Sequence, residues 1–197
     1  MGRWEPDARG RLIGAAIELY SSRGFEQTTV ADIAERAGVT ERTFFRHFAD
    51  KREVLFNGSA TLLDAVVAAI AAAPVWLAPV EVMGRAMEAG AAQLGVERDY
   101  ARTRAAVIAA NPSLLERELL KLASMGAAST AALRERGVPA SAASLAAETG
   151  VTVFKLGFDR WTGSTDDPGD LGAPDDLALC IRAALTKLRA LTADAGR

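Results

Sequence analysis

The stretch TVADIAERAGVTERTFFRHFADK, residues 29–51, decides the fold of this chain. It holds two short helical patterns on either side of Gly38, and glycine adopts the left-handed backbone of a tight turn without strain. Ala34 lies where the two helices would cross, and a larger side chain there would push them apart. Val39 and Phe44 are placed to fill the space beneath the second helix. The pattern therefore predicts a helix-turn-helix.

A third helix is predicted upstream of this stretch. One face of it carries four apolar residues at the i, i+3, i+4, i+7 spacing of a helix: Ile13, Ala16, Ile17 and Tyr20. Gly24 supplies a stop after it. Thr28 or Thr29, and then Thr40, have the side chains preferred at the N-caps of the two following helices. We therefore expect a three-helix helix-turn-helix domain over residues 1–50.

The overall charge of the chain gives no support for nucleic-acid binding. The formal net charge is −2, and residues 1–58 carry nine Lys or Arg against nine Asp or Glu. The local distribution is more informative, because residues 40–52 carry four basic side chains against two acidic ones. This short stretch is the basic patch that DNA binding requires.

The outer face of the second helix predicts contact with DNA. It carries Arg42, Thr43, Arg46 and His47, whose side chains can hydrogen bond to phosphates or to base edges. A helical hairpin with a solvated charged face would share this pattern. The upstream helix, the short turn and the basic second helix together favour DNA binding over that alternative.

Residues 11–56, and residues 29–51 above all, resemble the N-terminal domain of the TetR family of transcriptional regulators. The resemblance implies a DNA-binding regulator whose helical C-terminal domain binds a small molecule and dimerises. It also implies DNA contacts at eight positions: Thr29, Thr40, Arg42, Thr43, Phe45, Arg46, His47 and Lys51.

The resemblance gives these positions different roles. Thr29 and Lys51 look like phosphate contacts, and Arg42 looks like a guanine reader through its bidentate guanidinium group. The family often has Tyr where this chain has Phe45, so a hydroxyl-to-phosphate bond would be lost. Arg46 is expected to supply a replacement contact.

Residues 51–197 are predicted to form a helical ligand-binding and dimerisation domain. Proline and glycine punctuate six further helical patterns, at residues 51–73, 79–95, 97–110, 112–136, 141–162 and 174–193. The whole chain is therefore predicted to be all-α, with about nine helices in total. Residues 163–174 are rich in Gly, Asp and Pro and are predicted to be a loop without calcium-site spacing.

Several side chains of this second domain are candidates to line a pocket for a small effector: Trp76, Met83, Met87, Arg102, Arg104, Phe154, Phe158 and Trp161. Methionine and aromatic residues at helical spacing more often form ordinary core, and that alternative stays open. Either arginine could pair with an anionic ligand. Residues 104–119 resemble a TetR subgroup that includes mycofactocin-type regulators, which implies a hydrophobic or acyl-thioester effector.

The last two predicted helices each carry apolar residues on more than one face. Two such helices from each subunit could form a four-helix interface, which is how the family is expected to dimerise, and a homodimer would suit a palindromic operator. The alternative is that both faces are internal core. The interface candidates are Val153, Leu156, Leu177, Ile181, Leu185 and Leu188.

Other classes of protein are not favoured by the sequence. Residues 65–80 are uncharged but shorter than the roughly 20 residues of a membrane span, and no signal-peptide pattern is expected at the N-terminus. Cys180 is the single cysteine and His47 the single histidine, which gives no metal cluster, disulfide or nucleophile–base pair. We therefore expect a cytoplasmic DNA-binding repressor that is not an enzyme and has no cofactor. The alternative is an architectural DNA-binding protein without an effector.

Overall fold

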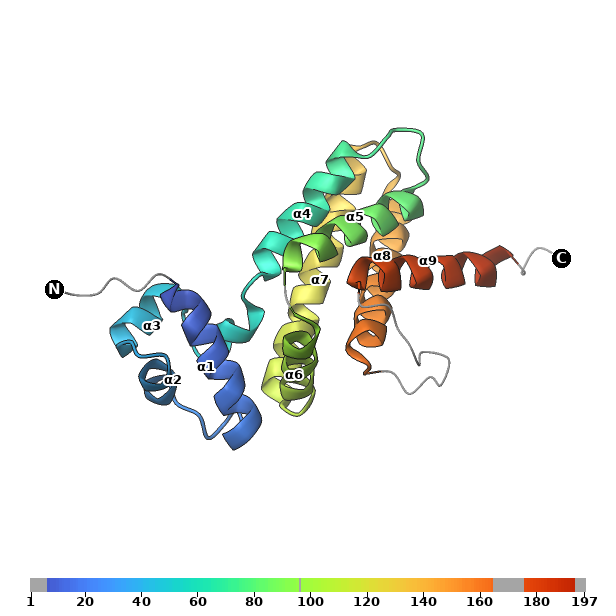
Figure 1. The fold of residues 1–197 in the computed structure, drawn as a ribbon. Coiled ribbons are helices and arrows are strands. Elements are labelled where there is room, and N and C mark those ends of the chain that lie inside the picture. Colours follow the sequence, from blue (N-terminus) through green and yellow to red (C-terminus); the bar gives the residue numbers. More distant parts are fainter. Residues whose placement is uncertain (1–6, 96, 165–175, 194–197) are drawn as a thin grey trace. The chain divides into compact units, whose positions relative to one another are not determined.

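The computed structural model describes residues 7–95, 97–164 and 176–193, and this part of the chain is helical with connecting turns and loops (Figure 1). It confirms the predicted all-α class. The chain divides into two compact units: unit 1 is Met1–Asn57 with Tyr100–Glu118, and unit 2 is Gly58–Asp99 with Leu119–Arg197. The predicted loop at residues 163–174 lies for the most part outside the described residues.

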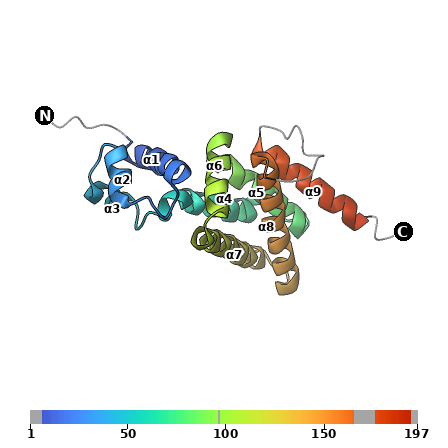
Figure 2. The same ribbon diagram turned by 90° about the horizontal axis from the view of Figure 1, so that it is seen from below.

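Unit 1 contains the predicted three-helix arrangement. Its first elements are α1 (Ala8–Arg23), α2 (Val30–Arg36), α3 (Glu41–His47) and the 3₁₀ helix η1 (Glu53–Phe56). The unit also includes most of α6 (Arg98–Ala109) and the beginning of α7 (Pro112–Glu135). In both views α1, α2 and α3 lie together (Figure 1, Figure 2).

The core of unit 1 joins segments that are far apart in the sequence. Leu12 and Phe44 are fully buried, and they belong to the same cluster as Phe56 of η1, Ile108 of α6 and Leu114 of α7. Burial of these apolar side chains is the main favourable term that holds the unit together. This explains why the unit extends beyond the predicted boundary at residue 50 and takes in residues 100–118.

The buried face of α1 is wider than its predicted apolar stripe. Ala16 and Tyr20 are buried as expected, whereas Ile13 and Ile17 are only partly buried. The adjacent face is buried in their place, and its side chains are Leu12, Ala15 and Leu19. The buried face of α1 is therefore rotated by part of a turn from the predicted apolar face, because α1 packs against α2, α3 and η1.

Unit 2 is organised around α5. Its helices are α4 (Ser59–Ala72), α5 (Pro79–Leu94), the remainder of α7, α8 (Ala140–Thr162) and α9 (Leu177–Ala193). Helix α5 packs against α4, α8 and α9, and α8 also packs against α9 (Figure 2). At Gly157 a Cβ atom would lie 2.8 Å from the backbone nitrogen of Ile181. Helices α8 and α9 therefore approach each other too closely at this point for any residue larger than glycine at position 157.

The helix expected at residues 51–73 is divided in the structure. Gly58, whose φ is +95°, separates η1 from α4. Residues 53–72 are apolar and long enough to resemble a membrane span by length and composition, and 28% of this stretch is buried. Gly58 divides it into η1 and α4, and α4 packs against α5. The other predicted helices of the second domain lie within three residues of those observed.

Candidate nucleic-acid interface

Helix α2 begins with a complete capping box. The Thr29 hydroxyl accepts a hydrogen bond from the Asp32 backbone nitrogen (3.1 Å) and donates to the Asp32 carboxylate (2.6 Å), which also accepts from the Thr29 nitrogen (2.8 Å). The hydrogen bond from the Thr29 side chain holds the pKa of Asp32 below its ordinary value. Thr29 is exposed, but its hydroxyl proton is already donated within the helix start. Its predicted phosphate contact remains a prediction.

The turn between α2 and α3 has the predicted geometry. Gly38 has a φ of +67°, which only glycine adopts without strain. The Val39 nitrogen donates to the carbonyl of Ala34 (2.9 Å), which closes the turn. Ala34 is buried at the crossing, and Phe44 is fully buried beneath α3. These residues confirm the helix-turn-helix.

The N-terminal half of α3 presents its polar side chains outward. Thr40 caps the helix, and its hydroxyl accepts from the Thr43 nitrogen at 3.2 Å. Four side chains line one surface hollow along the helix: Arg42, Thr43, Phe45 and Arg46. Phe45 is 55% exposed, although its neighbour Phe44 is fully buried. A large apolar ring held in the open beside two arginines suits contact with the sugar–phosphate backbone.

His47 is less accessible than the other predicted DNA contacts. It lies partly buried at the C-terminus of α3, with its ring centroid 6.4 Å from that of Phe48. Its Nε2 atom is enclosed and has no hydrogen-bond partner among the described residues. In this conformation the imidazole does not offer that nitrogen to DNA.

The ammonium group of Lys51 bonds to backbone carbonyls of the segment that precedes α2. Its Nζ atom donates to the backbone carbonyls of Phe25 (2.8 Å), Glu26 (3.3 Å) and Thr28 (3.0 Å). An ammonium group has three N–H bonds to donate. These carbonyls take all three donors in this structure, and the expected phosphate contact of Lys51 remains a prediction.

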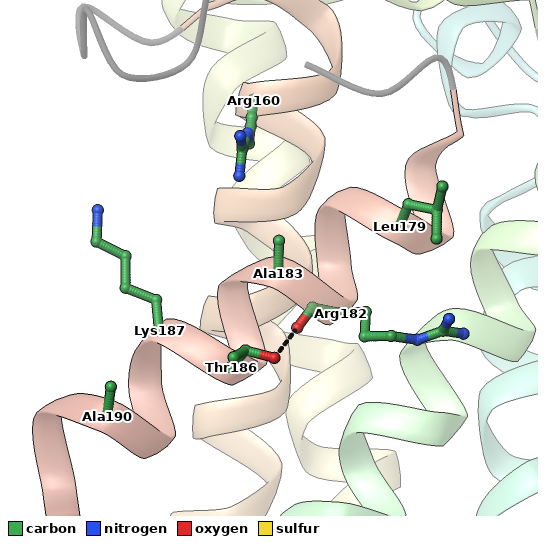
Figure 3. A pocket seen from close by; sticks show the side chains of 7 residues that line it. All are labelled: Arg160, Leu179, Arg182, Ala183, Thr186, Lys187 and Ala190. Atoms are coloured by element: carbon green, nitrogen blue, oxygen red, sulfur yellow. Dashed lines mark hydrogen bonds between the residues drawn. The ribbon is translucent and has the colours of Figure 1, made fainter. Parts of the chain in front are cut away.

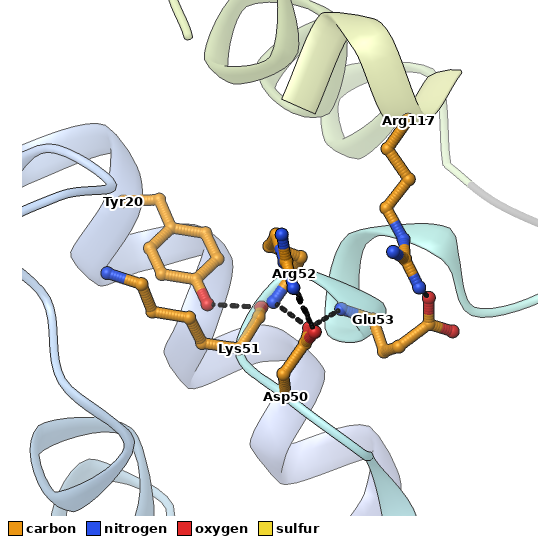
Figure 4. Close-up of polar contacts among 6 residues, drawn as sticks. All are labelled: Tyr20, Asp50, Lys51, Arg52, Glu53 and Arg117. Carbon is orange, nitrogen blue, oxygen red and sulfur yellow. Dashed lines mark hydrogen bonds and ion pairs between the residues drawn. The ribbon is translucent and has the colours of Figure 1, made fainter. Parts of the chain in front are cut away.

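The charge of Arg52 is also neutralised locally. Its guanidinium group donates to the Asp50 carboxylate at 2.8 Å, and Asp50 also accepts from the backbone nitrogens of Arg52 and Glu53 (Figure 4). Partial burial raises the pKa of Asp50, but the hydrogen bond and charge of Arg52 outweigh it, so the pKa lies below its ordinary value. Of the four basic side chains in residues 40–52, Arg42 and Arg46 are thus the two whose cationic groups have no polar partner among the described residues.

Two arginines of α6 and α7 enclose Phe56 of η1. The Arg104 guanidinium lies 5.3 Å from the Phe56 ring centroid and that of Arg117 lies 5.7 Å from it, both within cation–π range. Arg104 donates to the Leu55 carbonyl (2.6 Å) and to Glu118 (2.8 Å). Arg117 forms an ion pair with Glu53, as drawn in Figure 4. Arg104 is therefore a structural residue of unit 1, which corrects its proposed place in an effector pocket.

The other effector-pocket candidates lie in different environments. Met83 and Met87 are fully buried in unit 2, and Phe154 and Trp161 are also buried. The partly buried ring of Phe158 stacks on Phe154 with a centroid distance of 6.2 Å. Trp76, by contrast, is 76% exposed in the loop between α4 and α5, so it lines no interior pocket as described. Arg102 is exposed on α6.

The predicted dimer residues need a similar correction. Four of them, Val153, Leu177, Ile181 and Leu185, are buried inside unit 2 and offer no surface to a second protomer. Leu156 is 51% exposed and Leu188 is partly buried. The outer faces of α8 and α9 instead carry a surface hollow, drawn in Figure 3, whose lining residues are Arg160, Leu179, Arg182, Ala183, Thr186, Lys187 and Ala190.

The geometry of α2, the turn and α3 is that of a helix-turn-helix, a motif that many DNA-binding proteins place in the major groove. Residues 12–57 match the family model described as bacterial regulatory proteins, tetR family. By this N-terminal domain the chain resembles the tetR family. It is 42% identical over 81 residues to the transcriptional regulator TcmR of Streptomyces glaucescens, and 35% identical over 63 residues to MftR of Mycobacterium tuberculosis, a regulator named for mycofactocin biosynthesis.

These sequence matches cover 41% and 32% of this chain but only 36% and 32% of the two regulators. The chain therefore spans about a third of the length of the curated relatives it matches. A likeness over most of the chain comes from the crystal structure of Thermus thermophilus FadR, described as a TetR-family repressor in complex with lauroyl-CoA. The identity is 28%, the TM-score is 0.50, and the match covers 90% of this chain and 91% of that one.

A second structure, a TetR-family regulator from Mesorhizobium loti, has a TM-score of 0.54 and 18% identity over 93% of this chain and 96% of its own. At this identity the likeness concerns the fold alone.

Proposed function

We propose that this chain is a transcriptional repressor that binds a palindromic operator as a homodimer and is released by a small hydrophobic effector. The observation that carries the proposal is the exposed face of α3, where Arg42, Thr43, Phe45 and Arg46 line one surface directly after the Gly38 turn. In helix-turn-helix proteins this helix enters the major groove with its N-terminal residues at the base edges. The protein is proposed to act in the cytoplasm, without catalytic activity, cofactor or membrane partner.

Within this proposal the residues of α3 have different roles in DNA binding. Arg42 lies in the first turn with its side chain exposed, and its planar guanidinium suits bidentate bonding to O6 and N7 of guanine. Thr40 and Thr43 flank it at the helix start. Phe45 and Arg46 lie further along the helix, where sugar and phosphate contacts fix the register of the helix on DNA.

The dimer is proposed to form through the outer faces of α8 and α9. Leu156, Leu179 and Leu191 are large apolar side chains that remain exposed on these helices. Leu156 lies one turn before Arg160 on α8, and Leu179 and Arg160 both line the hollow in Figure 3. Large apolar side chains exposed on the faces of two adjacent helices suit a surface that is covered in an assembly.

The effector site is proposed to lie in the apolar interior of unit 2, around Met83, Met87, Phe154 and Trp161. Methionine side chains are flexible enough to repack around a ligand. The bound lauroyl-CoA of the T. thermophilus repressor supports an acyl-type effector here. Because α6 and α7 each contain residues of both units, a change of packing in unit 2 would reach unit 1 along these helices.

Selection from a pool of random-sequence duplexes tests the DNA-binding part of the proposal. We expect enrichment of an inverted repeat whose half-sites are about 10 base pairs apart, or a multiple of that. Failure to enrich any sequence would contradict operator binding. Lauroyl-CoA is then titrated into the complex with the selected duplex. Release supports the effector, whereas unchanged binding across a panel of acyl-CoAs favours an architectural protein.

Sedimentation of Leu156→Glu tests the interface. We expect a folded monomer, because a carboxylate would be placed in the apolar contact. Leu120→Glu, on the exposed face of α7, is the matched control and should leave the dimer intact. A dimeric Leu156→Glu protein would exclude this face.

A further inference from the structure

The hydrogen bonds of Lys51 fix the loop that leads into α2. Its three N–H donors go to carbonyls of residues 25, 26 and 28, and Nζ also lies 4.4 Å from the ring centroid of Phe25. The next residue, Thr29, is the N-cap of α2. Lys51 therefore holds the loop up to the first residue of the helix-turn-helix.

The backbone of Lys51 is itself held by α1. The Tyr20 hydroxyl donates to the Lys51 carbonyl at 2.6 Å (Figure 4). Burial, together with the negative charge of Asp50, raises the pKa of Tyr20, so the phenol keeps the proton it donates. Lys51 thus joins α1 to the start of α2 through both its backbone and its side chain.

We propose that Lys51 is a positioning residue for the helix-turn-helix and makes no phosphate contact. The proposal rests on the proposed binding of DNA. To reach a phosphate, Nζ would have to leave carbonyl acceptors that satisfy its three donors, and those carbonyls would lose their partner. As long as the bonds persist, Lys51 acts on DNA only through the orientation of α2 and of α3, which packs against it.

The salt dependence of DNA binding distinguishes a positioning role of Lys51 from a direct phosphate contact. Each phosphate that a protein neutralises contributes about −0.9 to the slope of log Kobs against log salt concentration. We expect Lys51→Met to weaken binding to the selected duplex at every salt concentration, by about tenfold or more, with an unchanged slope. Lys51→Arg should weaken it similarly, because a planar guanidinium cannot direct its donors to the same three carbonyls.

The proposal would be overturned by a slope shallower by about 0.9 per protomer in Lys51→Met, or by wild-type affinity in Lys51→Arg, since arginine also binds phosphate well. Wild-type affinity and slope in a folded Lys51→Met protein would overturn it too. Circular dichroism shows whether each variant is folded, and if Lys51→Met is not, Lys51→Arg decides alone. Failure of the wild-type protein to select any duplex would instead count against the proposed function.

A separate observation concerns Arg9, in the first turn of α1. Its guanidinium lies 5.6 Å from the ring centroid of Phe48, the C-cap residue of α3. Arg9 is exposed and makes no ion pair with the described residues. Arg36 and Arg52, by contrast, are paired with Glu18 and Asp50. The aromatic ring orients the Arg9 cation without neutralising its charge.

We infer that Arg9 contacts a DNA phosphate beside the C-terminal end of α3, although sequence patterns gave no reason to select it. This inference also rests on the proposed DNA binding. Arg9→Gln should make the salt slope shallower by about 0.9 per protomer, equally on selected and random duplexes, whereas Arg9→Lys should keep the slope. Arg36→Gln, which removes the same charge from a paired site, is the matched control and should leave the slope unchanged. An unchanged slope in Arg9→Gln would overturn the assignment.

Discussion

The two units of this molecule share one kind of polar contact and differ in how closely their helices approach one another. Unit 1 combines its apolar core with specific polar contacts, such as the Lys51 bonds to three carbonyls and the pairs of Arg104 and Arg117 around Phe56. Unit 2 has contacts of the same kind, since the Arg136 guanidinium group bonds to the carbonyls of Ala71, Ala73 and Pro74. It adds close approaches between helices, as at Gly157 against Ile181. Such sites leave no room for a larger side chain, so the packing of unit 2 is the more sensitive to small changes in volume.

The largest expected effect tests whether η1 belongs to the core of unit 1. Phe56→Ala should lower the free energy of unfolding by about 3–5 kcal/mol, because it leaves a cavity and removes the ring between two arginines. Chemical denaturation followed by circular dichroism measures this. Phe45→Ala, at an exposed position, is the matched control and should change stability by less than about 1 kcal/mol. Equal losses of stability in Phe56→Ala and Phe45→Ala would show that Phe56 is no more important to the core than the exposed Phe45.

The next effect tests close packing in unit 2. Gly157→Ala would place a Cβ atom 2.8 Å from the backbone of Ile181, so α8 and α9 must separate. We expect a loss of about 1–3 kcal/mol in unfolding free energy, as for other overpacked sites. Gly14→Ala is the control, because nothing lies within 4 Å of its Cβ position on α1. A neutral Gly157→Ala would mean that the helix pair adjusts freely.

A third change affects DNA binding and leaves packing intact. Arg42→Ala should weaken operator binding by about 1–3 kcal/mol and relax specificity at one base position. Its thermal unfolding should match that of the wild type, since the side chain is exposed. A mobility-shift titration provides the affinity. Equal binding by the two proteins would show that Arg42 reads no base.

The smallest expected effect concerns the Asp50–Arg52 pair. Asp50→Asn should lower stability near neutral pH by less than about 1 kcal/mol, since the pair is partly exposed. The pKa of Asp50 is depressed in the folded state, so its contribution is present above its ordinary value of 3.8 and is lost as the pH falls below it. The difference between wild type and variant should therefore disappear in acid. A difference that persists at about pH 2 would point to lost backbone hydrogen bonds instead.

The parts of the fold that were predicted correctly have local signals. Gly38 and the caps Thr29 and Thr40 determine where the helices of the helix-turn-helix end and begin. Proline and glycine set the remaining helix ends in the same way. By contrast, the tasks of Lys51 and Arg104 depend on partners 23–49 residues away in the sequence, which no local pattern reveals.

The burial of four predicted dimer residues was missed for a related reason. Helices α8 and α9 each carry two apolar faces, and periodicity alone does not distinguish the internal face from the outer one. The structure places Ile181 and Leu185 inside and leaves Leu156 and Leu179 outside. Arg9 was missed because its significance comes from the neighbouring Phe48 ring and not from its place in the sequence.

The discontinuity of unit 1 has a consequence for how such regulators can be recombined. A hybrid made by joining residues 1–57 to another regulator's second domain would carry Glu53 and Phe56 without the arginines that surround them here. Grafting residues 100–118 together with the N-terminal segment would restore those partners. A graft that includes both stretches of chain would keep the Glu53–Arg117 pair and the two arginines around Phe56.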